Sequence, residues 1–143
     1  MNIRYVTEED VRELMILESG SIEHPWTEED LIKLAKDQGK KGFVAEDGDR
    51  ILGYIGVSYL LDEAEIGNLV VEESSRRHGV GKALIEEVKS YLKDQGIARV
   101  YLEVAEDNEA ARALYIKCGF CAFNKRKDYY GKGRNADLMV CEI

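Results

Sequence analysis

Hydrophobic and polar positions follow two different periods along the chain, and the helical period dominates its first part. Residues 3–6 form a short run of β-like character. Apolar side chains then recur at helical spacing over residues 7–19 and again over residues 27–39. Thr7 and Thr27 head these two segments, and threonine favours the N-cap because its side-chain oxygen accepts a hydrogen bond from a first-turn N–H group. The pattern predicts a short strand followed by two amphipathic helices.

A period of two replaces the helical period in the middle of the sequence. Strand-like runs cover residues 42–46, 50–60 and 64–73, and turns separate them at residues 47–49 and 61–63. Strands that are joined by such short turns pair with their neighbours in opposite directions. The three runs are therefore predicted to form an antiparallel meander.

Helix and strand patterns alternate in the next part of the chain. A long apolar stripe of helical spacing begins at Val80 and ends at Gly96, and a strand-like run over residues 98–104 follows it. Another helical pattern covers residues 109–118. Because a strand–helix–strand crossover sets its two strands parallel, the strands before Val80 and at residues 98–104 are expected to run in the same direction.

The last pattern completes a mixed sheet. Asp107 or Asn108 can cap the helix that follows them, and the runs at residues 120–127 and 136–143 predict a hairpin around a polar loop. The whole pattern predicts an α/β fold of the mixed α+β kind, built as a single domain of residues 1–143. That length is enough for one hydrophobic core.

Charge and composition exclude several classes of protein. Of the 143 residues, 45% are hydrophobic and 34% are charged, which is not the composition of a disordered chain. A formal net charge of -8 argues against a nucleic-acid binder and against attraction to an anionic membrane, and it leaves a basic partner open. Apolar runs stay well short of the roughly 20 residues of a membrane span, and the first residues lack the apolar core of a signal peptide, so a cytoplasmic protein is expected.

The three cysteines do not form a recognisable disulfide or metal framework. Cys118 and Cys121 have a C-x-x-C spacing, but they enclose the Gly-Phe of a helix end, and neither a second pair nor a histidine follows. With Cys141 the number of cysteines is odd, which argues against a secreted disulfide scaffold. We therefore expect free thiols and no bound metal.

The stretch SSRRHGVGKALIEEV, residues 74–88, is a candidate phosphate-binding loop. A dinucleotide fingerprint would need a third glycine where Leu84 stands, and a Walker loop would need a glycine at Arg76, so neither motif is present. Gly79 and Gly81 nevertheless let backbone N–H groups approach an anion closely, at a helix N-terminus whose dipole favours negative charge. The alternative is a glycine turn with surface charges.

The same loop resembles that of a known family. Arg76, Gly79 and Gly81 are similar to the R/Q-x-x-G-x-G/A loop of the GNAT superfamily of N-acetyltransferases, and residues 101–120 resemble the strand and helix that follow in that superfamily. Its A-x-x-L-Y-x-x-x-G-F signature falls on Ala111, Leu114, Tyr115, Gly119 and Phe120. Within the superfamily, the stretches HPWTEE, LEV and KRKDYY resemble the RimI group of ribosomal-protein N-terminal alanine acetyltransferases. The resemblance covers nearly the whole chain.

This resemblance implies acetyl-CoA as the donor and the GNAT fold, a central mixed, mostly antiparallel sheet flanked by helices. Its fourth and fifth strands would splay apart and admit the pantetheine arm, which would pair with backbone groups of Leu69, Val70 and Val71. Asn108 is similar to a family residue that contacts the cofactor. The pyrophosphate would lie on the glycine loop, whose cofactor-binding residues would be Arg76, Arg77, His78, Gly79, Val80, Gly81 and Lys82. Within this loop, the imidazole of His78 is expected to face solvent rather than to act as a base.

Acetyl transfer to an amine requires a neutral nucleophile, a donor for the developing oxyanion and an acid for the departing thiolate. Glu103 is the candidate base. It shares a strand face with Tyr101, opposite an apolar face, and a carboxylate in such a strand is costly unless it is used or paired. The alternative is a glutamate that faces solvent or pairs with an arginine.

Tyr115 is the candidate acid. A phenol with a pKa near 10 can protonate a thiolate with a pKa near 8.5 at a cost of about 2 kcal/mol, which a positioned acid tolerates. The alternative is a core aromatic residue with a polar tip, because Ala111 and Leu114 lie on the same helix face.

The acceptor is less constrained by sequence. An α-amine with a pKa of about 7.8 is neutral roughly 400-fold more often at pH 7 than a lysine with a pKa of about 10.4, a difference of about 3.5 kcal/mol. This favours a protein N-terminus, with a basic ribosomal protein as the expected partner; a lysine, a small amine, or a CoA-binding sensor without catalysis are the alternatives. Trp26, Tyr129 and Tyr130 are candidate acceptor contacts, although packing alone would also explain them, and His24 is expected to belong to a packed loop.

Overall fold

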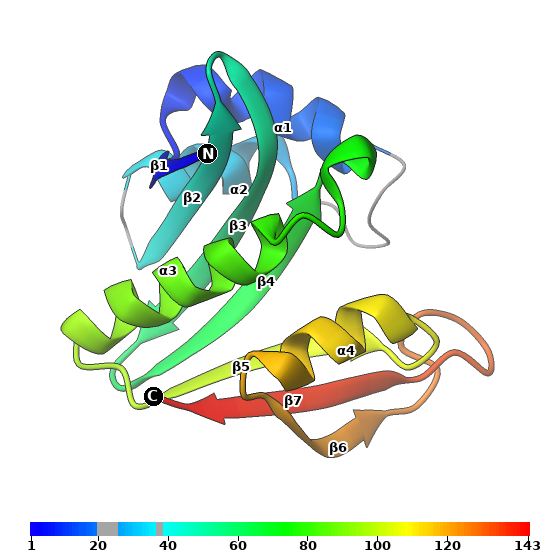
Figure 1. The fold of residues 1–143 in the computed structure, drawn as a ribbon. Coiled ribbons are helices and arrows are strands. Elements are labelled where there is room, and N and C mark those ends of the chain that lie inside the picture. Colours follow the sequence, from blue (N-terminus) through cyan, green and yellow to red (C-terminus); the bar gives the residue numbers. More distant parts are fainter. Residues whose placement is uncertain (20–25, 37–38) are drawn as a thin grey trace.

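The computed structural model describes residues 1–19, 26–36 and 39–143 (Figure 1). Its elements in chain order are β1 (Asn2–Tyr5), the 3-10 turn η1 (Glu8–Asp10), α1 (Val11–Glu18), α2 (Glu28–Lys36), β2 (Lys40–Asp47), β3 (Arg50–Leu60), β4 (Glu63–Val71), the 3-10 turn η2 (Glu73–Ser75), α3 (Val80–Asp94), β5 (Arg99–Ala105), α4 (Glu109–Lys117), β6 (Cys121–Arg126) and β7 (Ala136–Glu142). The elements that the hydrophobic periods predict are present in the predicted order.

The strands join one sheet in the order β1-β2-β3-β4-β5-β7-β6. Strands β2, β3 and β4 pair in antiparallel fashion, which confirms the predicted meander. Strands β4 and β5, which α3 connects, pair in parallel, as expected for a strand–helix–strand crossover. The predicted α/β fold with a mixed, mostly antiparallel sheet is therefore confirmed.

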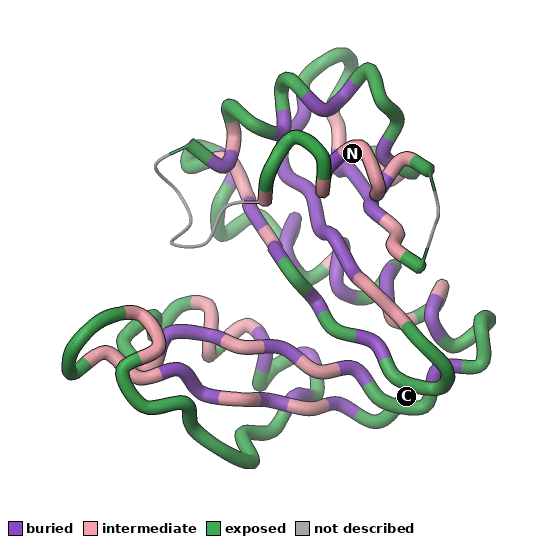
Figure 2. The backbone as a smooth tube through the Cα atoms, turned by 180° about the vertical axis from the view of Figure 1, so that it is seen from behind, coloured by how far each residue is buried: buried purple, intermediate pink, exposed green. Residues whose placement is uncertain are grey.

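Helices cover both faces of this sheet (Figure 1). On one face, α1 and α2 bury Leu14 and Leu31 against Tyr54 of β3. On the other face, α3 and α4 share a larger apolar cluster that includes Leu84 and Tyr115. Figure 2 shows the buried positions following the strands, as expected when successive side chains point to opposite faces and both faces are covered.

Strands β4 and β5 separate after a short ladder. Their parallel pairing runs from Glu63 with Arg99 to Glu65 with Tyr101 and covers three positions, whereas β5 pairs with β7 over its whole length. Beyond Glu65 the edge of β4 that faces β5 carries no strand partner in the described parts of the chain, so its backbone N–H and C=O groups are not used in the sheet there. The splayed fourth and fifth strands that the resemblance implies are confirmed, and Figure 2 shows the two arms diverging.

A β-bulge at Gly67 changes the faces to which the side chains of β4 point. The register with β3 shifts between Ile66 and Asn68, so Gly67 is the extra residue. Before the bulge, Ile66 packs in the cluster beneath α3; after it, Leu69 contacts that cluster and Val70 packs beneath α1 and α2. The bulge therefore turns Asn68 toward the α1 and α2 side of the sheet.

Capping interactions set several helix ends. At α2, Asp30 donates its N–H to Oγ1 of Thr27 at 3.1 Å, and Thr27 donates its N–H to Oδ2 of Asp30 at 3.3 Å, which is a capping box. Asn108, rather than Asp107, caps α4, because its Oδ1 accepts a first-turn N–H at 3.2 Å. The predicted helix of residues 7–19 is divided into η1 and α1, and residues 37–38 lie outside the described residues.

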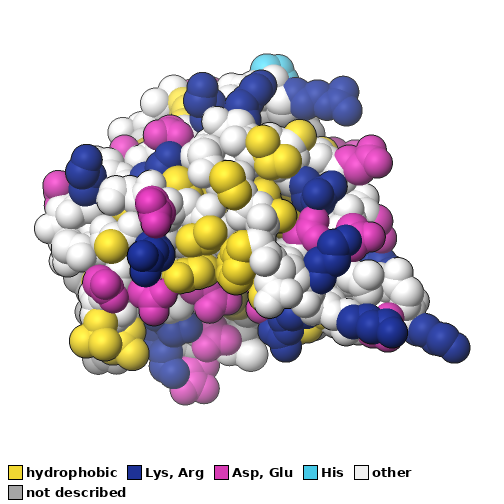
Figure 3. Space-filling model, turned by 90° about the horizontal axis from the view of Figure 1, so that it is seen from below, with side chains coloured by type: hydrophobic (Ala, Val, Ile, Leu, Met, Phe, Trp, Pro, Cys, Tyr) yellow, Lys and Arg dark blue, Asp and Glu magenta, His cyan; other side chains and the backbone are white. Residues whose placement is uncertain are grey.

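Charged groups of both signs border apolar side chains on the surface seen from below (Figure 3). Strand β6 forms one edge of the sheet, and its six residues are all exposed. Cys118 and Cys141 are buried and Cys121 is exposed, and all three are free thiols. Within the described residues, none of the helices combines the length and the apolar character needed to cross a membrane.

Candidate active site

A groove of about 600 Å³ opens where β4 and β5 part. Its walls come from β4, β5, the beginning of α4 and the connection between β6 and β7. The structure brings both residues predicted for proton transfer and all three predicted acceptor contacts to this one groove. The residues from the sequence prediction that line it are Trp26, Leu69, Glu103, Asn108, Tyr115, Tyr129 and Tyr130.

Glu103 faces the groove from β5 and is paired with an arginine. Nη1 of Arg126 on β6 donates to Oε1 of Glu103 at 2.7 Å, across the intervening strand β7. The side chain of Glu103 is 22% exposed and that of Arg126 is 50% exposed, so the pair lies at the groove surface. The arginine pairing that was the alternative for Glu103 is thus observed. This pairing does not exclude a role as the base, because a carboxylate has two oxygens and Arg126 donates to Oε1 alone.

Tyr115 reaches the groove from α4 and is 8% exposed. Its ring makes an edge contact with Phe120, with 5.9 Å between the ring centroids. Burial, with smaller contributions from Tyr130 and Cys118, raises the pKa of Tyr115 above its ordinary value of 10. The phenol therefore stays protonated and can donate a hydrogen bond into the groove, while its ring packs in the core.

The N-terminus of α3 presents backbone donors suited to an anion. Gly79 is the N-cap residue with φ 81°, a left-handed conformation that glycine adopts without steric cost. The first backbone hydrogen bond of the helix is donated by the N–H of Ala83 to the carbonyl oxygen of Gly79 at 3.0 Å. The N–H groups of Val80, Gly81 and Lys82 precede it and have no intrahelical acceptor. A pyrophosphate group fits such an arrangement of donors.

Basic side chains surround these donors. Arg76, Arg77, His78 and Lys82 are exposed, as expected for His78 in particular. Nε of Arg76 donates to the carbonyl oxygen of Val71 at 3.1 Å, which joins the loop to the end of β4. Arg77 has φ 67°, so the loop places a second residue in the left-handed region. These positions agree with an anion-binding loop, and their contacts with a cofactor stay a prediction.

The loop lies close to α4 because glycine occupies the second position of α3. A Cβ atom at Gly81 would come within 2.9 Å of Cδ2 of Leu114. Leu114 is next to Tyr115 on α4, and Leu69 of β4 also contacts the cluster that contains this tyrosine. The candidate anion-binding loop, the edge of β4 and the predicted acid are therefore neighbours. Asn108 joins them at the start of α4, where its Oδ1 serves as the cap and its amide group can donate.

Trp26 forms another wall of the groove. Its ring lies over two glycines, since a Cβ atom at Gly67 would be 1.9 Å from Cζ2 and one at Gly56 would be 2.7 Å from Cζ3. The Nζ atom of Lys40 lies 4.7 Å from the centre of a ring of Trp26, within cation–π range. The bulge glycine thus creates the space that the indole occupies. His24 lies outside the described residues.

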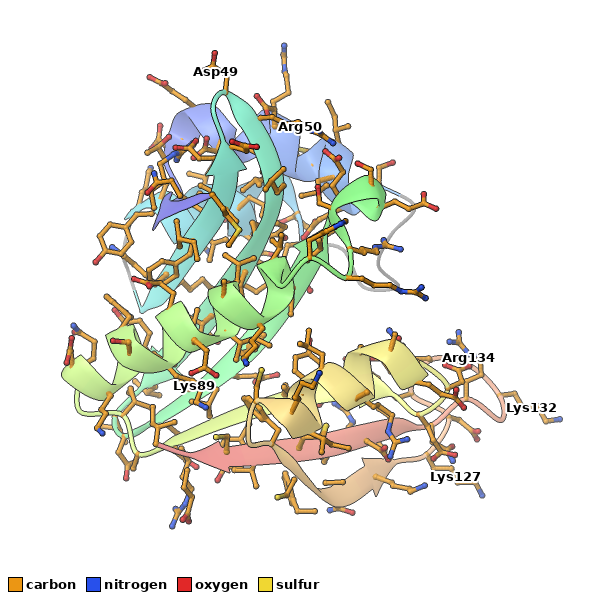
Figure 4. The ribbon with its side chains drawn as sticks, viewed as in Figure 1. Asp49, Arg50, Lys89, Lys127, Lys132 and Arg134 are labelled. Atoms are coloured by element: carbon orange, nitrogen blue, oxygen red, sulfur yellow. The ribbon has the colours of Figure 1, made fainter. Side chains whose placement is uncertain are left out.

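Tyr129 and Tyr130 border the groove from the connection between β6 and β7. Their ring centroids are 4.9 Å apart, and the guanidinium carbon of Arg126 lies 4.1 Å from the centroid of Tyr129. Arg134 holds the connection by donating from Nε to Oδ2 of Asp107 at 2.8 Å, and Figure 4 shows Arg134 at this end of the molecule. The cation–π contact of Arg126 and the ion pair of Arg134 with Asp107 thus hold the two tyrosines at the groove.

A buried carboxylate that the sequence did not predict lies next to the groove. Glu18 is 2% exposed; its Oε1 accepts hydrogen bonds from the hydroxyl of Tyr54 and, at 2.7 Å, from Nδ2 of Asn68, and its Oε2 accepts one from the N–H of Trp26 at 3.0 Å. Desolvation by burial raises the pKa of Glu18 to about 7, although the donors from Asn68 and Trp26 oppose that shift. Glu18 therefore joins α1 to two residues that line the groove.

A signal for Glu18 is present in the sequence. The residue falls seven positions after Val11 and four after Leu14, so it lies on the apolar stripe of α1. A charged residue on a buried stripe requires partners, because an unpaired buried charge is costly. Those partners come from β3, from β4 and from Trp26, two residues before α2, and the helical pattern alone does not identify them.

Glu65 is a second groove residue outside the predicted set. It stands on β4 opposite Tyr101 at the last position of the β4–β5 ladder, and it lines the groove. Burial and then the neighbouring charge of Glu103 raise the pKa of Glu65, while Arg126 and Lys40 partly offset this. Strand alternation is the signal, because Ala64 and Ile66 are apolar while Glu65 belongs to the opposite face.

Residues 8–120 match the Acetyltransferase (GNAT) family. The chain is 31% identical over 144 residues to the ribosomal protein bS18-alanine N-acetyltransferase of Haemophilus ducreyi, with 96% of this chain and 97% of that protein covered. Among solved structures, the ribosomal-protein-S18-alanine N-acetyltransferase from Escherichia coli has a TM-score of 0.89 at 27% identity and covers 99% of this chain and 93% of its own. Ard1 from Thermoplasma volcanium has a TM-score of 0.90 at 28% identity, covering 99% and 97%.

The match extends over most of the sequence and includes the parts that build the groove, except for the connection between β6 and β7. It covers α1, the glycine loop, the splayed strands and α4, and it ends at Phe120. The described architecture and this match agree with the resemblance found in the loop and in α4. The chain belongs to the Acetyltransferase (GNAT) family.

Proposed function

We propose that this chain is an acetyl-CoA-dependent N-acetyltransferase that transfers acetyl directly to the N-terminal α-amine of a protein, with the N-terminal alanine of a ribosomal protein as the acceptor. The observation that carries the proposal is the meeting of Glu103 and Tyr115 at one groove between splayed strands. The similarity to a bS18-alanine N-acetyltransferase along nearly the whole chain supports this acceptor. Both substrates would meet within the single domain predicted for residues 1–143.

Backbone groups would hold the donor. The N–H groups of Val80, Gly81 and Lys82 suit the pyrophosphate, because the helix N-terminus favours negative charge and the neighbouring side chains are basic. The edge of β4 at residues 69–71, which has no strand partner on the β5 side, would align the pantetheine arm, whose amide groups need the same hydrogen bonds as a strand. Asn108 would donate from its amide group at the start of α4. The acetyl group would then lie between β4 and β5.

Glu103 would act as the base for the acceptor amine. The nitrogen of this amine would attack the acetyl carbonyl carbon, the carbon–sulfur bond would break, and the amine proton would pass to the carboxylate of Glu103. Tyr115 would donate the proton, or a hydrogen bond, to the departing thiolate. Burial raises the pKa of this phenol, so full transfer to a thiolate with a pKa near 8.5 costs more than the roughly 2 kcal/mol expected for an ordinary phenol. A strong hydrogen bond to sulfur in the transition state supplies the same stabilisation at lower cost.

The acceptor groove suits a positively charged chain end. Glu103 and Glu65 both line it, and Trp26, Tyr129 and Tyr130 provide aromatic walls. An α-amine is far more often neutral at pH 7 than a lysine amine, so one carboxylate is a sufficient base. A basic ribosomal protein would be attracted to a chain of net charge -8, and such an acceptor would place the reaction in the cytoplasm.

The test measures CoA release from acetyl-CoA with two matched peptides. One begins Ala-Arg-Tyr with a free N-terminus, and the other has the same residues, a blocked N-terminus and one free lysine. Turnover of the first peptide alone supports the proposal. Turnover of the second alone, or of polyamines alone, replaces the acceptor by a lysine or a small amine. Binding of acetyl-CoA without turnover of any amine would make the chain a CoA sensor.

A further inference from the structure

Two hollows on the acceptor side of the sheet meet at Glu65. The groove described above is one of them, and a second hollow of about 380 Å³ extends along the ends of β3, β4 and β5. Ser58, Leu60 and Tyr101 line the second hollow, and Glu65 lines both. A chain that enters the groove with its N-terminus at Glu103 would therefore pass Glu65 as it leaves.

The sheet register places the two carboxylates side by side. Glu65 pairs with Tyr101 in the parallel ladder, and Glu103 lies two residues further along β5, on the same face as Tyr101. Strand spacing and rise then separate the Cα atoms of Glu65 and Glu103 by about 8 Å. Successive Cα atoms of an acceptor are about 3.8 Å apart, so an arginine or lysine at its second position can reach Glu65 when its α-amine is at Glu103.

Charges at this place are not balanced. Arg126 donates to Glu103 at 2.7 Å, whereas Glu65 makes neither a hydrogen bond nor an ion pair with any described residue. Local desolvation and then the charge of Glu103 raise the pKa of Glu65, and the charges of Arg126 and Lys40 offset only part of this shift, so the ionised form is incompletely compensated in the free protein. A cation that arrives with the acceptor would supply this compensation.

The surroundings of Glu65 suit a long cationic side chain rather than a small ion. Tyr101 faces the second hollow and makes an edge contact with Phe123, with 5.9 Å between centroids. An aliphatic stem can pack on such aromatic surface while its guanidinium or ammonium group reaches the carboxylate. The polar and apolar parts of the site thus correspond to those of arginine and lysine.

We propose that Glu65 is a specificity-determining residue that selects acceptors with arginine or lysine at the position after the N-terminal residue. This inference rests on the proposed N-terminal acetylation. Glu65 is not a catalytic residue here, because its contact is with a side chain that does not react. The substrate class is therefore narrower than a free α-amine, since it includes the charge of the second residue.

The test compares kcat/KM for peptides that begin Ala-Arg-Tyr, Ala-Gln-Tyr and Ala-Glu-Tyr. The wild-type protein should prefer the arginine peptide over the glutamine peptide by about tenfold, the value of one charge-assisted hydrogen bond at a partly exposed site. Glu65→Gln should bring this ratio close to one by lowering kcat/KM for the arginine peptide alone. Glu65→Lys should reverse the preference between the arginine and glutamate peptides. Glu87→Gln, an equal charge change on the exposed face of α3, should leave every ratio unchanged.

Two failures can be told apart. If the wild-type protein turns over none of the free N-termini, the proposed function is wrong and the inference is wrong with it. If the wild-type protein acetylates the peptides but Glu65→Gln preserves the tenfold ratio, or lowers kcat/KM equally for all three peptides, the inference alone is overturned. The affinity of each variant for CoA, measured by calorimetry, verifies that the protein is folded.

Discussion

The two sides of the groove are built from different kinds of groups. The proposed donor side, defined as residues 69–71, the loop of residues 76–82 and Asn108, reaches the groove at Leu69 and Asn108 and presents mainly backbone groups whose positions follow from one strand edge and one helix end. The acceptor side, defined as Trp26, Glu65, Glu103, Tyr129 and Tyr130, presents side chains from separate elements. Arg126 and Glu18 hold parts of this side from β6 and α1.

This difference explains which side can be recognised from a sequence. A backbone site requires only that glycine permits a conformation and that a helix begins at the correct residue, so a short motif describes it. A side-chain site depends on contacts between distant residues, and each contact can be replaced without changing a motif. We expect the donor side to be robust to single side-chain changes and the acceptor side to be sensitive to them.

The strongest challenge to this comparison is Glu103→Gln. If Glu103 is the base, the change should lower kcat for the Ala-Arg-Tyr peptide by about 10³-fold, within the usual range for loss of a general base. CoA affinity should stay nearly the same because Glu103 belongs to the acceptor side. The loss should be largest at low pH and smaller above pH 8, where the α-amine, with a pKa of about 7.8, loses its proton to water.

Arg126→Gln separates this role from simple ion pairing. The exposed pair is worth about 1 kcal/mol or less, so both variants should lose a similar, small amount of stability in urea denaturation. Arg126→Gln keeps the carboxylate and should retain most of kcat. Equal losses of kcat in the two variants would assign Glu103 a structural role and leave the groove without its predicted base.

The next largest effect concerns Glu18 and the stability of the acceptor side. Burial raises the pKa of Glu18 from 4.5 to about 7, so the folded protein binds a proton more tightly than the unfolded chain does. The favourable contribution is therefore complete below about pH 4.5 and is lost as the pH rises through about 7. At about 1.4 kcal/mol per pKa unit, the free energy of unfolding should fall by about 3 kcal/mol across this window. Urea denaturation at successive pH values measures it.

Glu18→Gln should flatten this slope, because the amide does not titrate. Exposed Glu13 on the same helix provides the control, and Glu13→Gln should leave the slope unchanged. The amide also places an NH2 group or an oxygen where Trp26 N–H now donates to Oε2, so one orientation loses that hydrogen bond. A wild-type protein whose stability does not fall between pH 5 and pH 7 would contradict the assignment.

Much of the fold could be predicted because local patterns determine it. The run at residues 50–60 coincides with β3, and the stripe that begins at Val80 coincides with the start of α3. The change at Gly67 in the faces to which the side chains of β4 point could not be predicted from the pattern, because a bulge breaks the alternation on which the prediction depends. The partners of Glu18 lie 36 residues away at Tyr54 and 50 residues away at Asn68, so only the folded sheet brings them together.

The sequence predicts many of the residues of the candidate site but not the side chains that pair with them. Glu103 and Tyr115 lie in short family-like segments and were found together with the glycine loop. Arg126 pairs with Glu103 across 23 residues and an intervening strand, and neither alternation nor motif spacing specifies that partner. Glu65 belongs to a strand whose family-like features are apolar, so the family resemblance does not point to this residue.

A smaller effect is expected from Gly67→Ala, which tests how tightly Trp26 of the acceptor side is packed. The new Cβ atom would lie 1.9 Å from Cζ2 of Trp26, so the indole must move. Overpacking of this kind costs about 2 kcal/mol of stability. KM for the peptide should rise while CoA affinity is retained. In a Trp26→Ala background the clash disappears, and the same glycine substitution should cost little; additive losses in this double-mutant cycle would contradict the contact.

The smallest effect is expected on the donor side, from Gly79→Ala at the N-cap of α3. Both Gly79, with φ 81°, and Gly96, with φ 82° just beyond the other end of α3, adopt the left-handed conformation with open space around the missing Cβ. An alanine at either position should therefore cost about 1 kcal/mol of stability, because the strain is the same. At Gly79, relaxation of that strain also turns the N–H groups of the first helical turn away from the pyrophosphate. CoA affinity should fall about fivefold, the equivalent of about 1 kcal/mol.

Gly96→Ala is the matched control, since it reproduces the strain at the end of α3 that does not bind the donor. Calorimetry with CoA should find its affinity unchanged. If both alanine variants bind CoA equally well, the helix N-terminus does not hold the pyrophosphate, and the donor side would depend on Arg76, Arg77 and Lys82. In that case both sides of the groove would rely on side chains, and the loop motif would report a folding requirement of glycine rather than a binding site. A fivefold loss confined to Gly79→Ala instead means that the conformation of one residue sets donor affinity through the backbone.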